Sequence, residues 1–158
     1  MRKTFFNILH QKMKEDETII LLSADMGYGL LDKIRDSYPD RFFNVGSSEQ
    51  LMIGIATGFA LEKKIPLCYS ITSFLLYRPF EFIRNYMDNG KIPIKLVGGG
   101  RDQDYGYLGH THHAADDIDI LSQLQNIKTW KPENETTLPL IIPEILYNKQ
   151  PCYINLRK

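Results

Sequence analysis

Residues 41–61 read RFFNVGSSEQLMIGIATGFAL, and this stretch decides how the rest of the chain is interpreted. A short β-prone run, 42–45, stops at Gly46, and an apolar segment with helical spacing follows it. The segment is apolar on nearly every side, which predicts a helix that is buried all round. Glu49 stands at its start, either as an N-terminal capping acid or as a carboxyl held in an apolar site so that its proton can be used.

Two glycines of this helix, Gly54 and Gly58, lie four residues apart and therefore share one side of it. Each weakens a helix by about 0.8–1 kcal/mol relative to Ala. Because that cost needs a compensating gain, the pair predicts that something approaches the helix closely there.

The composition is that of an ordinary globular protein, and 158 residues are enough for one domain spanning 1–158. A formal net charge of zero predicts no general attraction to nucleic acid or to an anionic membrane. No apolar run approaches the roughly 20 residues that a membrane span needs, and the first residues lack the apolar core of a secretory signal. Cys68 and Cys152 are isolated, so we expect both to be reduced and buried in a cytoplasmic protein.

Strand-like and helix-like segments alternate along the chain, which predicts a three-layer α/β/α domain with a mostly parallel sheet. Ligands of such sheets bind outside the carboxyl ends of the strands. Asp25, Glu49, Phe74 and the loop 100–113 all follow expected strands, so we expect them to converge on one edge. The expected strands are 18–23, 42–45, 66–71, 92–97, 128–131 and 151–156, and the expected helices are 2–14, 30–38, 80–89, 114–124, the one after Gly46 and one opening at 136–140.

Residues 70–80, SITSFLLYRPF, bring aromatic rings to the end of an expected strand. For Phe80 and Phe82 the plainer interpretation is ordinary core. Phe74 and Tyr77 fall instead in the expected loop and helix start, at the edge where a ligand would bind. A ring stacked on a planar ligand there would add about 0.5–1.5 kcal/mol beyond simple burial.

Residues 105–118, YGYLGHTHHAADDI, carry three histidines within four residues. No acidic or cysteine partner has matching spacing, and the start of a helix would splay the rings apart, so we predict no metal site. His110 is interpretable as a solvent-facing loop residue or as a substrate contact. The preceding run, 98–101, lacks a G-x-G-x-x-G pattern and a helix directly after it, which predicts a flexible rim loop. Its Arg101 is either solvated or in contact with an anionic substrate.

Together these segments resemble the pyrimidine-binding domain of the transketolase family. The stretch 41–61 is close to the pattern R-F-x-N-V-G-[IV]-[AS]-E-Q-x-[MA]-[VI]-G, and it departs from it only at Ser47-Ser48. Residues 109–117 resemble the G-x-[ST]-H-[HQ]-x-x-[DE]-[DE] loop of transketolases and deoxyxylulose-phosphate synthases, and residues 23–25 match a Ser-Ala-Asp segment. The resemblance spans nearly the whole chain and implies an enzyme, a transferase that depends on thiamine diphosphate.

The resemblance assigns roles toward the cofactor. Glu49 would bind the aminopyrimidine ring and act as a catalytic residue, because a protonated carboxyl there favours the imino form of that ring. Phe74 and Tyr77 would pack rings around it. Ile71 stands where some transketolases have a third ring, and Asp25 would lie near the cofactor.

The resemblance also assigns roles toward the substrate. His112 follows Thr in the motif and would face the substrate as a second catalytic residue. His110, where many relatives have proline, together with His113 and Arg101, are further candidates for substrate contacts.

In this family a separate domain holds the diphosphate and its Mg²⁺ through a Gly-Asp-Gly motif that this chain lacks. The chain also ends where a third domain would begin. We therefore expect the pyrimidine-binding subunit of a split transketolase-like enzyme, which transfers a ketol unit between sugars or related carbonyl compounds. Its partner would resemble a transketolase N-terminal section in an α₂β₂ assembly, with the helix after Gly46 near the two-fold axis. The alternatives are a subunit of a two-chain 2-oxoacid decarboxylase and a non-catalytic assembly partner.

Overall fold

The computed structural model describes residues 1–158, and six strands alternate with helices along them. The strands are β1 (Ile19–Ser23), β2 (Phe42–Asn44), β3 (Ile65–Ile71), β4 (Lys95–Gly99), β5 (Lys128–Trp130) and β6 (Cys152–Leu156). The α-helices are α1 (Arg2–Glu15), α2 (Asp32–Ser37), α3 (Glu49–Leu61), α4 (Thr72–Tyr77), α5 (Phe80–Phe82), α6 (Asp117–Leu121) and α7 (Leu138–Tyr147). A π-helical segment, η2 (Ile83–Asn89), continues α5, and 3-10 turns form η1 (Pro39–Arg41), η3 (Gly106–Leu108), η4 (His110–His112) and η5 (Glu135–Thr137).

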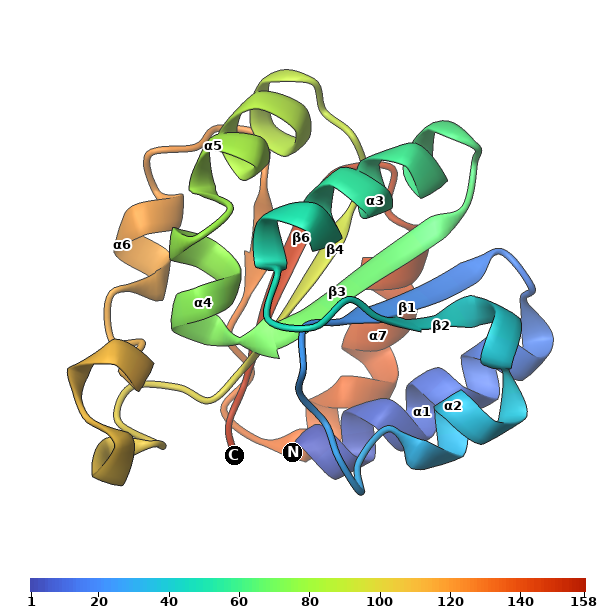
Figure 1. The fold of residues 1–158 in the computed structure, drawn as a ribbon, viewed down its shortest axis with the longest axis horizontal. Coiled ribbons are helices and arrows are strands. Elements are labelled where there is room, and N and C mark those ends of the chain that lie inside the picture. Colours follow the sequence, from blue (N-terminus) through green and yellow to red (C-terminus); the bar gives the residue numbers. More distant parts are fainter.

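The six strands form one sheet in the order β2-β1-β3-β4-β6-β5, and every neighbouring pair is parallel. Helices α1 and α7 cover one face of the sheet, and α3, α4 and α6 cover the other (Figure 1). This arrangement confirms the expected three-layer α/β/α fold.

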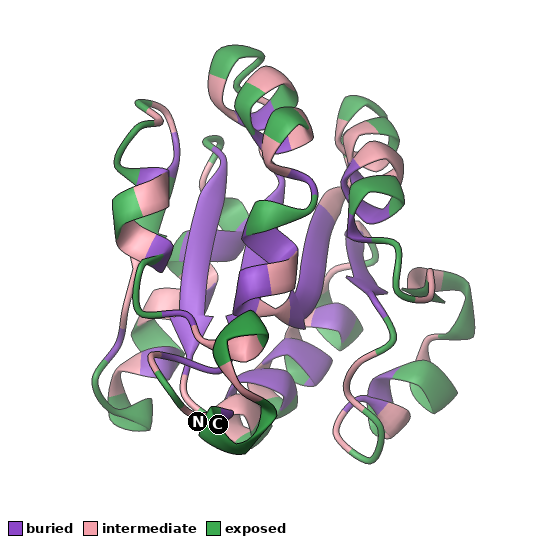
Figure 2. Ribbon diagram, turned by 60° about the vertical axis from the view of Figure 1, so that its left-hand side comes forward, coloured by how far each residue is buried: buried purple, intermediate pink, exposed green.

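One apolar layer lies on each face of the sheet. Successive strand residues point to opposite faces, so Leu21 packs with the α1 and α7 side while Leu22 packs with the α3 side. All five residues of β1 are buried, as expected for a strand covered on both faces, and Figure 2 shows the same for most of the central strands. The two cysteines, Cys68 and Cys152, are free and buried, as predicted.

The carboxyl ends of the strands meet at one edge of the sheet. The chain leaves β1 toward β2 on one side, whereas it leaves β3 toward β4 on the other. Such a change of direction opens a crevice between the loops of neighbouring strands, and ligands of open α/β sheets bind there. The residues singled out by the sequence follow β1, β2, β3 and β4 at this edge.

The glycine run 98–100 is not the flexible rim loop that the sequence suggested. Gly98 and Gly99 are the last, buried residues of β4, which runs two residues further than expected. A Cβ atom on Gly98 would lie 2.5 Å from Oγ1 of Thr72 and 3.1 Å from the hydroxyl of Tyr153. Glycine is needed here because neighbouring side chains pack directly on the strand.

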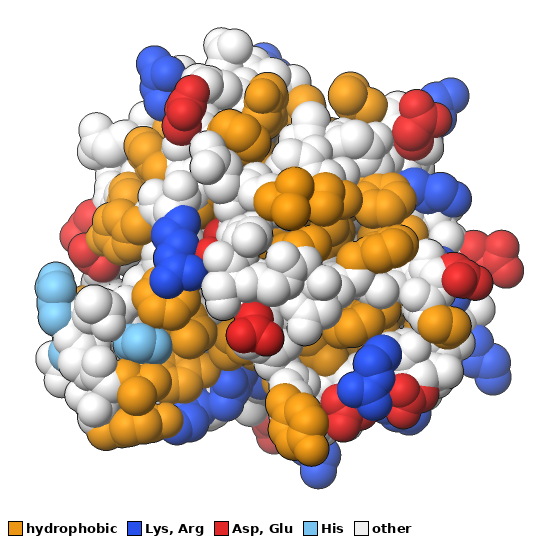
Figure 3. Space-filling model, viewed as in Figure 1, with side chains coloured by type: hydrophobic (Ala, Val, Ile, Leu, Met, Phe, Trp, Pro, Cys, Tyr) orange, Lys and Arg blue, Asp and Glu red, His pale blue; other side chains and the backbone are white.

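Helix α3 is not buried all round in this chain. Its inner side is buried, whereas Leu51 and Leu61 on the outer side are 55% and 68% exposed. Figure 3 shows hydrophobic side chains gathered over this helix. A Cβ atom added to Gly54 would lie 3.6 Å from the Phe82 ring, and one added to Gly58 would meet nothing within 4 Å. No close approach within the chain therefore requires either glycine.

Two other elements differ from expectation. Helix α4 forms where a loop was expected, directly after β3, and the helix expected at 114–124 is limited to α6. None of the helices combines the length and the apolar character that a bilayer crossing demands.

Candidate active site

Glu49 is the first residue of α3, and its side chain is only 2% exposed at the carboxyl edge of the sheet. The hydroxyl of Ser70, in β3, donates to Oε1 of Glu49 at 3.2 Å. Nη1 of Arg78 donates to Oε1 at 3.0 Å and to Oε2 at 2.8 Å. The carboxylate is therefore buried but paired, and its site is more polar than the apolar surroundings that the sequence suggested.

The ring of Phe74 lies beside this pair. The guanidinium carbon of Arg78 is 3.9 Å from the centroid of the Phe74 ring, in a cation–π contact. Phe74 and Arg78 are four residues apart, so helix α4 and the residue after it bring them to the same side. Glu49 and Phe74, expected to contact one cofactor ring, are thus linked through a single side chain.

His112 lies on the other side of Phe74. The two rings meet edge to face with their centroids 4.8 Å apart, and the ring of Tyr105 is 6.3 Å from His112. Nδ1 of His112 is 2.9 Å from Oγ1 of Thr111, a hydrogen bond whose donor depends on the tautomer. The hydroxyl of Ser73 donates to the carbonyl of Thr111 at 2.8 Å and so ties the histidine loop, residues 100–116 between β4 and α6, to α4.

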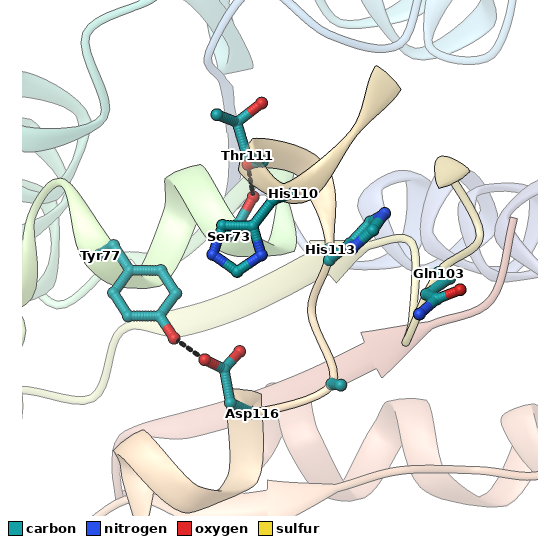
Figure 4. A pocket seen from close by; sticks show the side chains of 8 residues that line it. Ser73, Tyr77, Gln103, His110, Thr111, His113 and Asp116 are labelled. Atoms are coloured by element: carbon teal, nitrogen blue, oxygen red, sulfur yellow. Dashed lines mark hydrogen bonds between the residues drawn. The ribbon is translucent and has the colours of Figure 1, made fainter. Parts of the chain in front are cut away.

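A hollow of about 510 Å³ opens between α4 and the histidine loop. Figure 4 shows Tyr77, at the end of α4, and Asp116, just before α6, pointing toward one another across it, and the Tyr77 hydroxyl donates to the Asp116 carboxylate. Burial and the neighbouring Asp116 raise the pKa of Tyr77 to about 12, so this hydroxyl keeps its proton. His110 and His113 line the same hollow, and Nε2 of His113 is buried without a hydrogen-bond partner.

Asp25 and Ile71 lie at this edge but outside that hollow. Ile71 ends β3 and precedes α4. Asp25 follows β1 with a positive φ of 47°, and its backbone N–H donates to the side chain of Asn44 at 3.1 Å. Asp25 lines a smaller hollow of about 220 Å³ together with Tyr28, whereas Glu49, Phe74 and His112 line neither of the two hollows.

Both expectations for Arg101 are wrong, because its side chain is 1% exposed and bonds to the protein itself. Nε donates to Oδ1 of Asn155 at 2.9 Å, and Nη2 donates to the carbonyls of Pro132 and Asn155 at 2.9 and 3.0 Å. A guanidinium taken up in this way has no free face for a substrate. Arg101 instead anchors the start of the histidine loop on β6.

A layer of buried polar side chains, formed by Asp117, Tyr153 and Asn155, supports the histidine loop. The hydroxyl of Tyr153 donates to Oδ2 of Asp117 at 2.7 Å, and the amide of Asn155 donates to the same oxygen at 2.8 Å. Burial, with the Asp117 carboxylate beside it, raises the pKa of Tyr153 well above its usual value, so the hydroxyl stays a donor. Each buried polar group of this layer is hydrogen-bonded, which fixes the start of α6.

The three loop histidines do not join other ligands in a metal site. No group of three or more His, Cys, Asp or Glu side chains in the chain is arranged to hold a metal ion. His110 and His113 have ring centroids 6.1 Å apart at nearly perpendicular planes.

Sequence reasoning missed Arg78, Ser70 and Asp116. Arg78 escaped notice because a loop was expected at residues 72–77, and only a helix places residue 78 over Phe74. The spacing of four between them was the available signal. Asp116 stands at the first [DE] position of the motif over residues 109–117, but its partner Tyr77 is 39 residues away, so no local pattern predicts their contact.

The fold and this edge define a class of protein. It is a parallel α/β domain that presents a buried carboxylate, an aromatic ring and a histidine loop at the switch point, where the strand order changes direction between β1 and β3. The sequence profile of the transketolase pyrimidine-binding domain matches residues 1–158, and the chain belongs to that family. A 6-deoxy-6-sulfo-D-fructose transketolase subunit from Clostridium sp. (strain MSTE9) is 28% identical over 99% of this chain and 49% of that protein. An apulose-4-phosphate transketolase subunit from Actinobacillus succinogenes is 33% identical over 75% of this chain and 38% of its own length.

A solved structure described as a split gene transketolase, inactive β4 tetramer, superposes with a TM-score of 0.86 at 26% identity, over 99% of this chain and 50% of that one. The chain spans about half the length, or less, of the curated relatives it matches. The relatives therefore contain a second part that has no counterpart in these residues.

Proposed function

We propose that this chain supplies the aminopyrimidine-binding half of a split, thiamine diphosphate-dependent transketolase-like enzyme, which transfers a ketol unit between sugars or related carbonyl compounds. The observation that carries the proposal is the buried Glu49 carboxylate beside Phe74 and His112 at the switch point. Relatives named as transketolase subunits support it.

The residues present fit an aminopyrimidine ring. The guanidinium of Arg78, which is planar and carries N–H donors, already lies between the Phe74 ring and the Glu49 carboxylate. An aminopyrimidine is also planar and also offers N–H groups, so it would find a stacking surface and an acceptor there. When bound, thiamine diphosphate supplies the carbanion-stabilising chemistry of carbon–carbon bond cleavage.

In the proposed enzyme Glu49 would hold a ring nitrogen of the pyrimidine by a hydrogen bond and would exchange a proton there. Phe74, Tyr77 and Ile71 would form the wall against the ring, and Asp25, after β1, would lie near the cofactor. His112, His110 and His113 would contact the substrate. These assignments follow the family motif and the placement of the residues at one edge.

A partner subunit is part of the proposal. The chain contains no metal-binding cluster and no Gly-Asp-Gly motif, so the diphosphate and Mg²⁺ would be held by a chain that resembles a transketolase N-terminal section. The apolar outer side of α3, including exposed Leu51 and Leu61 and half-buried Phe59, would be covered on assembly, in an α₂β₂ complex near its two-fold axis. Two free, buried cysteines suit a cytoplasmic enzyme.

The first test is binding of thiamine diphosphate with Mg²⁺, by calorimetry, to this chain alone and to this chain mixed with its partner. We expect tight binding only by the mixture. Exchange of the C2 proton of the bound cofactor, followed by NMR, then reports whether the site activates it. Tight binding by the chain alone would contradict the two-subunit proposal, and binding without accelerated exchange would favour a non-catalytic assembly partner.

The key variant is Glu49→Gln, which keeps the shape of the side chain but cannot gain or lose a proton. We expect a loss of about 10²–10⁴-fold in turnover and in C2 exchange, the usual size of a general acid–base contribution. Glu81→Gln is the matched control, because Glu81 is exposed and its side chain is hydrogen-bonded only to Asn85. Product analysis with ketose donors and with 2-oxoacids separates a transketolase from a two-chain decarboxylase, which would accept only the latter.

A further inference from the structure

Arg78 joins the two groups that the proposed function assigns to the pyrimidine ring. Its Nη1 atom donates to both carboxylate oxygens of Glu49, at 3.0 and 2.8 Å, while its guanidinium lies 3.9 Å from the centroid of Phe74. A planar guanidinium suits both contacts, because it can stack on a ring face and hydrogen-bond in its own plane. One side chain therefore occupies the acceptor and the stacking surface at once.

The two partners of this ion pair differ in their freedom to move. The Glu49 side chain is 2% exposed and is also held by Ser70, whereas that of Arg78 is 46% exposed. Arg78 is therefore the partner that can withdraw into solvent, while Glu49 stays in place. The pairing that Glu49 loses when Arg78 leaves has to be replaced by whatever binds next.

We propose that Arg78 is a positioning residue of the pyrimidine site, which occupies the place of the aminopyrimidine ring between Glu49 and Phe74 and leaves when the ring binds. The inference rests on the proposed function, since it takes the ring to bind at Glu49. Until the ring arrives, Arg78 keeps the buried carboxylate paired, because an unpaired buried charge is strongly destabilising. Binding is then an exchange of one planar, stacked donor for another.

This exchange sets the apparent affinity for the cofactor. A site that is open for only a fraction of the time binds more weakly by that fraction. If Arg78 withdraws for roughly one tenth of the time, removal of its guanidinium raises the affinity about tenfold. A residue that merely supported the fold would not raise affinity when it is removed.

The decisive measurement is the dissociation constant of thiamine diphosphate with Mg²⁺ in the assembled two-subunit enzyme. We expect about tenfold tighter binding for Arg78→Gln and an intermediate gain for Arg78→Lys, which keeps the charge without the planar group. Arg84→Gln is the matched control, because the Arg84 side chain is exposed and bonds only to its neighbour Asn85. Unchanged or weaker binding by Arg78→Gln, with wild-type binding intact, would overturn the inference alone. Absence of binding in every variant would overturn the proposed function and the inference together.

A second measurement follows Arg78 itself in the free chain, where no cofactor is needed. The Nε–H and guanidinium signals of Arg78, seen by NMR of arginine-labelled protein, should be shifted by the Phe74 ring and should lose that shift in Phe74→Leu. On saturation of the assembled enzyme with cofactor, the wild-type signals should move toward those of an exposed arginine such as Arg84. If the Arg78 signals did not change in Phe74→Leu, or stayed shifted at saturation, Arg78 would not be displaced by the ring.

Discussion

Replacement of Arg101 by methionine should destabilise the chain by about 3–5 kcal/mol. Methionine keeps much of the apolar stem but removes the guanidinium, which is 1% exposed and donates three hydrogen bonds of 2.9–3.0 Å. The variant leaves two backbone carbonyls and one amide oxygen without a donor, at about 1–3 kcal/mol for each unsatisfied group. Deletion of one partner from a buried charged network costs about 3–5 kcal/mol as a whole. The contact with Glu133 adds little, because that carboxylate is 77% exposed.

Urea unfolding followed by circular dichroism measures this loss, and the melting temperature should fall by roughly 6–20 °C for a domain of this size. Arg84→Met is the control, and its change should stay within about 0.5 kcal/mol because that side chain lies on the surface. If Arg101→Met cost less than about 1 kcal/mol, the interpretation of Arg101 as the anchor of the histidine loop would be refuted.

Three shorter predictions concern packing, pH and assembly. Gly98→Ala should cost about 1–3 kcal/mol in urea unfolding, because its Cβ would lie 2.5 Å from a neighbouring hydroxyl oxygen, whereas Gly106→Ala, which meets open space, should cost under about 0.5 kcal/mol. Burial raises the pKa of Tyr69 to about 12, so the folded state holds this proton more tightly than the unfolded chain. Between pH 10 and 12 the free energy of unfolding of the wild type should therefore fall more steeply than that of Tyr69→Phe. Equal slopes in urea unfolding measured across this pH range would contradict the prediction. Leu51→Glu, on the outer side of α3, should abolish assembly with the partner subunit in sedimentation velocity while its free energy of unfolding stays that of wild type. Leu140→Glu, at a position 80% exposed on α7, should assemble like wild type.

The order of strands and helices was predictable because each apolar run had a length and period of its own. Strand β1 and helix α1 follow directly from such runs, and so does the position of Glu49 between a strand and a helix. Helix α4 was not predictable in this way, since residues 72–77 are short and follow a strand without a break. A local pattern carries too little information to end one element and begin the next within a single residue.

Side-chain partners were harder to predict than elements. Arg101 stands in a glycine-rich, polar stretch, and its burial depends on Asn155, 54 residues away in the sequence. The exposed side of α3 was missed for a different reason. An apolar helix predicts that something covers it, but the sequence does not say whether the cover belongs to the same chain.

The way the histidine loop is held also bears on how the protein can change. Arg101 is bonded outside the hollow, and the tie to Ser73 uses only the backbone carbonyl of Thr111, whereas Gln103, His110 and Ala115 line the hollow. Substitutions that lower stability and substitutions that change ligand selectivity therefore fall at different positions. A library randomised at those three lining positions would sample new selectivities on an intact scaffold, and natural divergence within the family has the same low-cost route open to it.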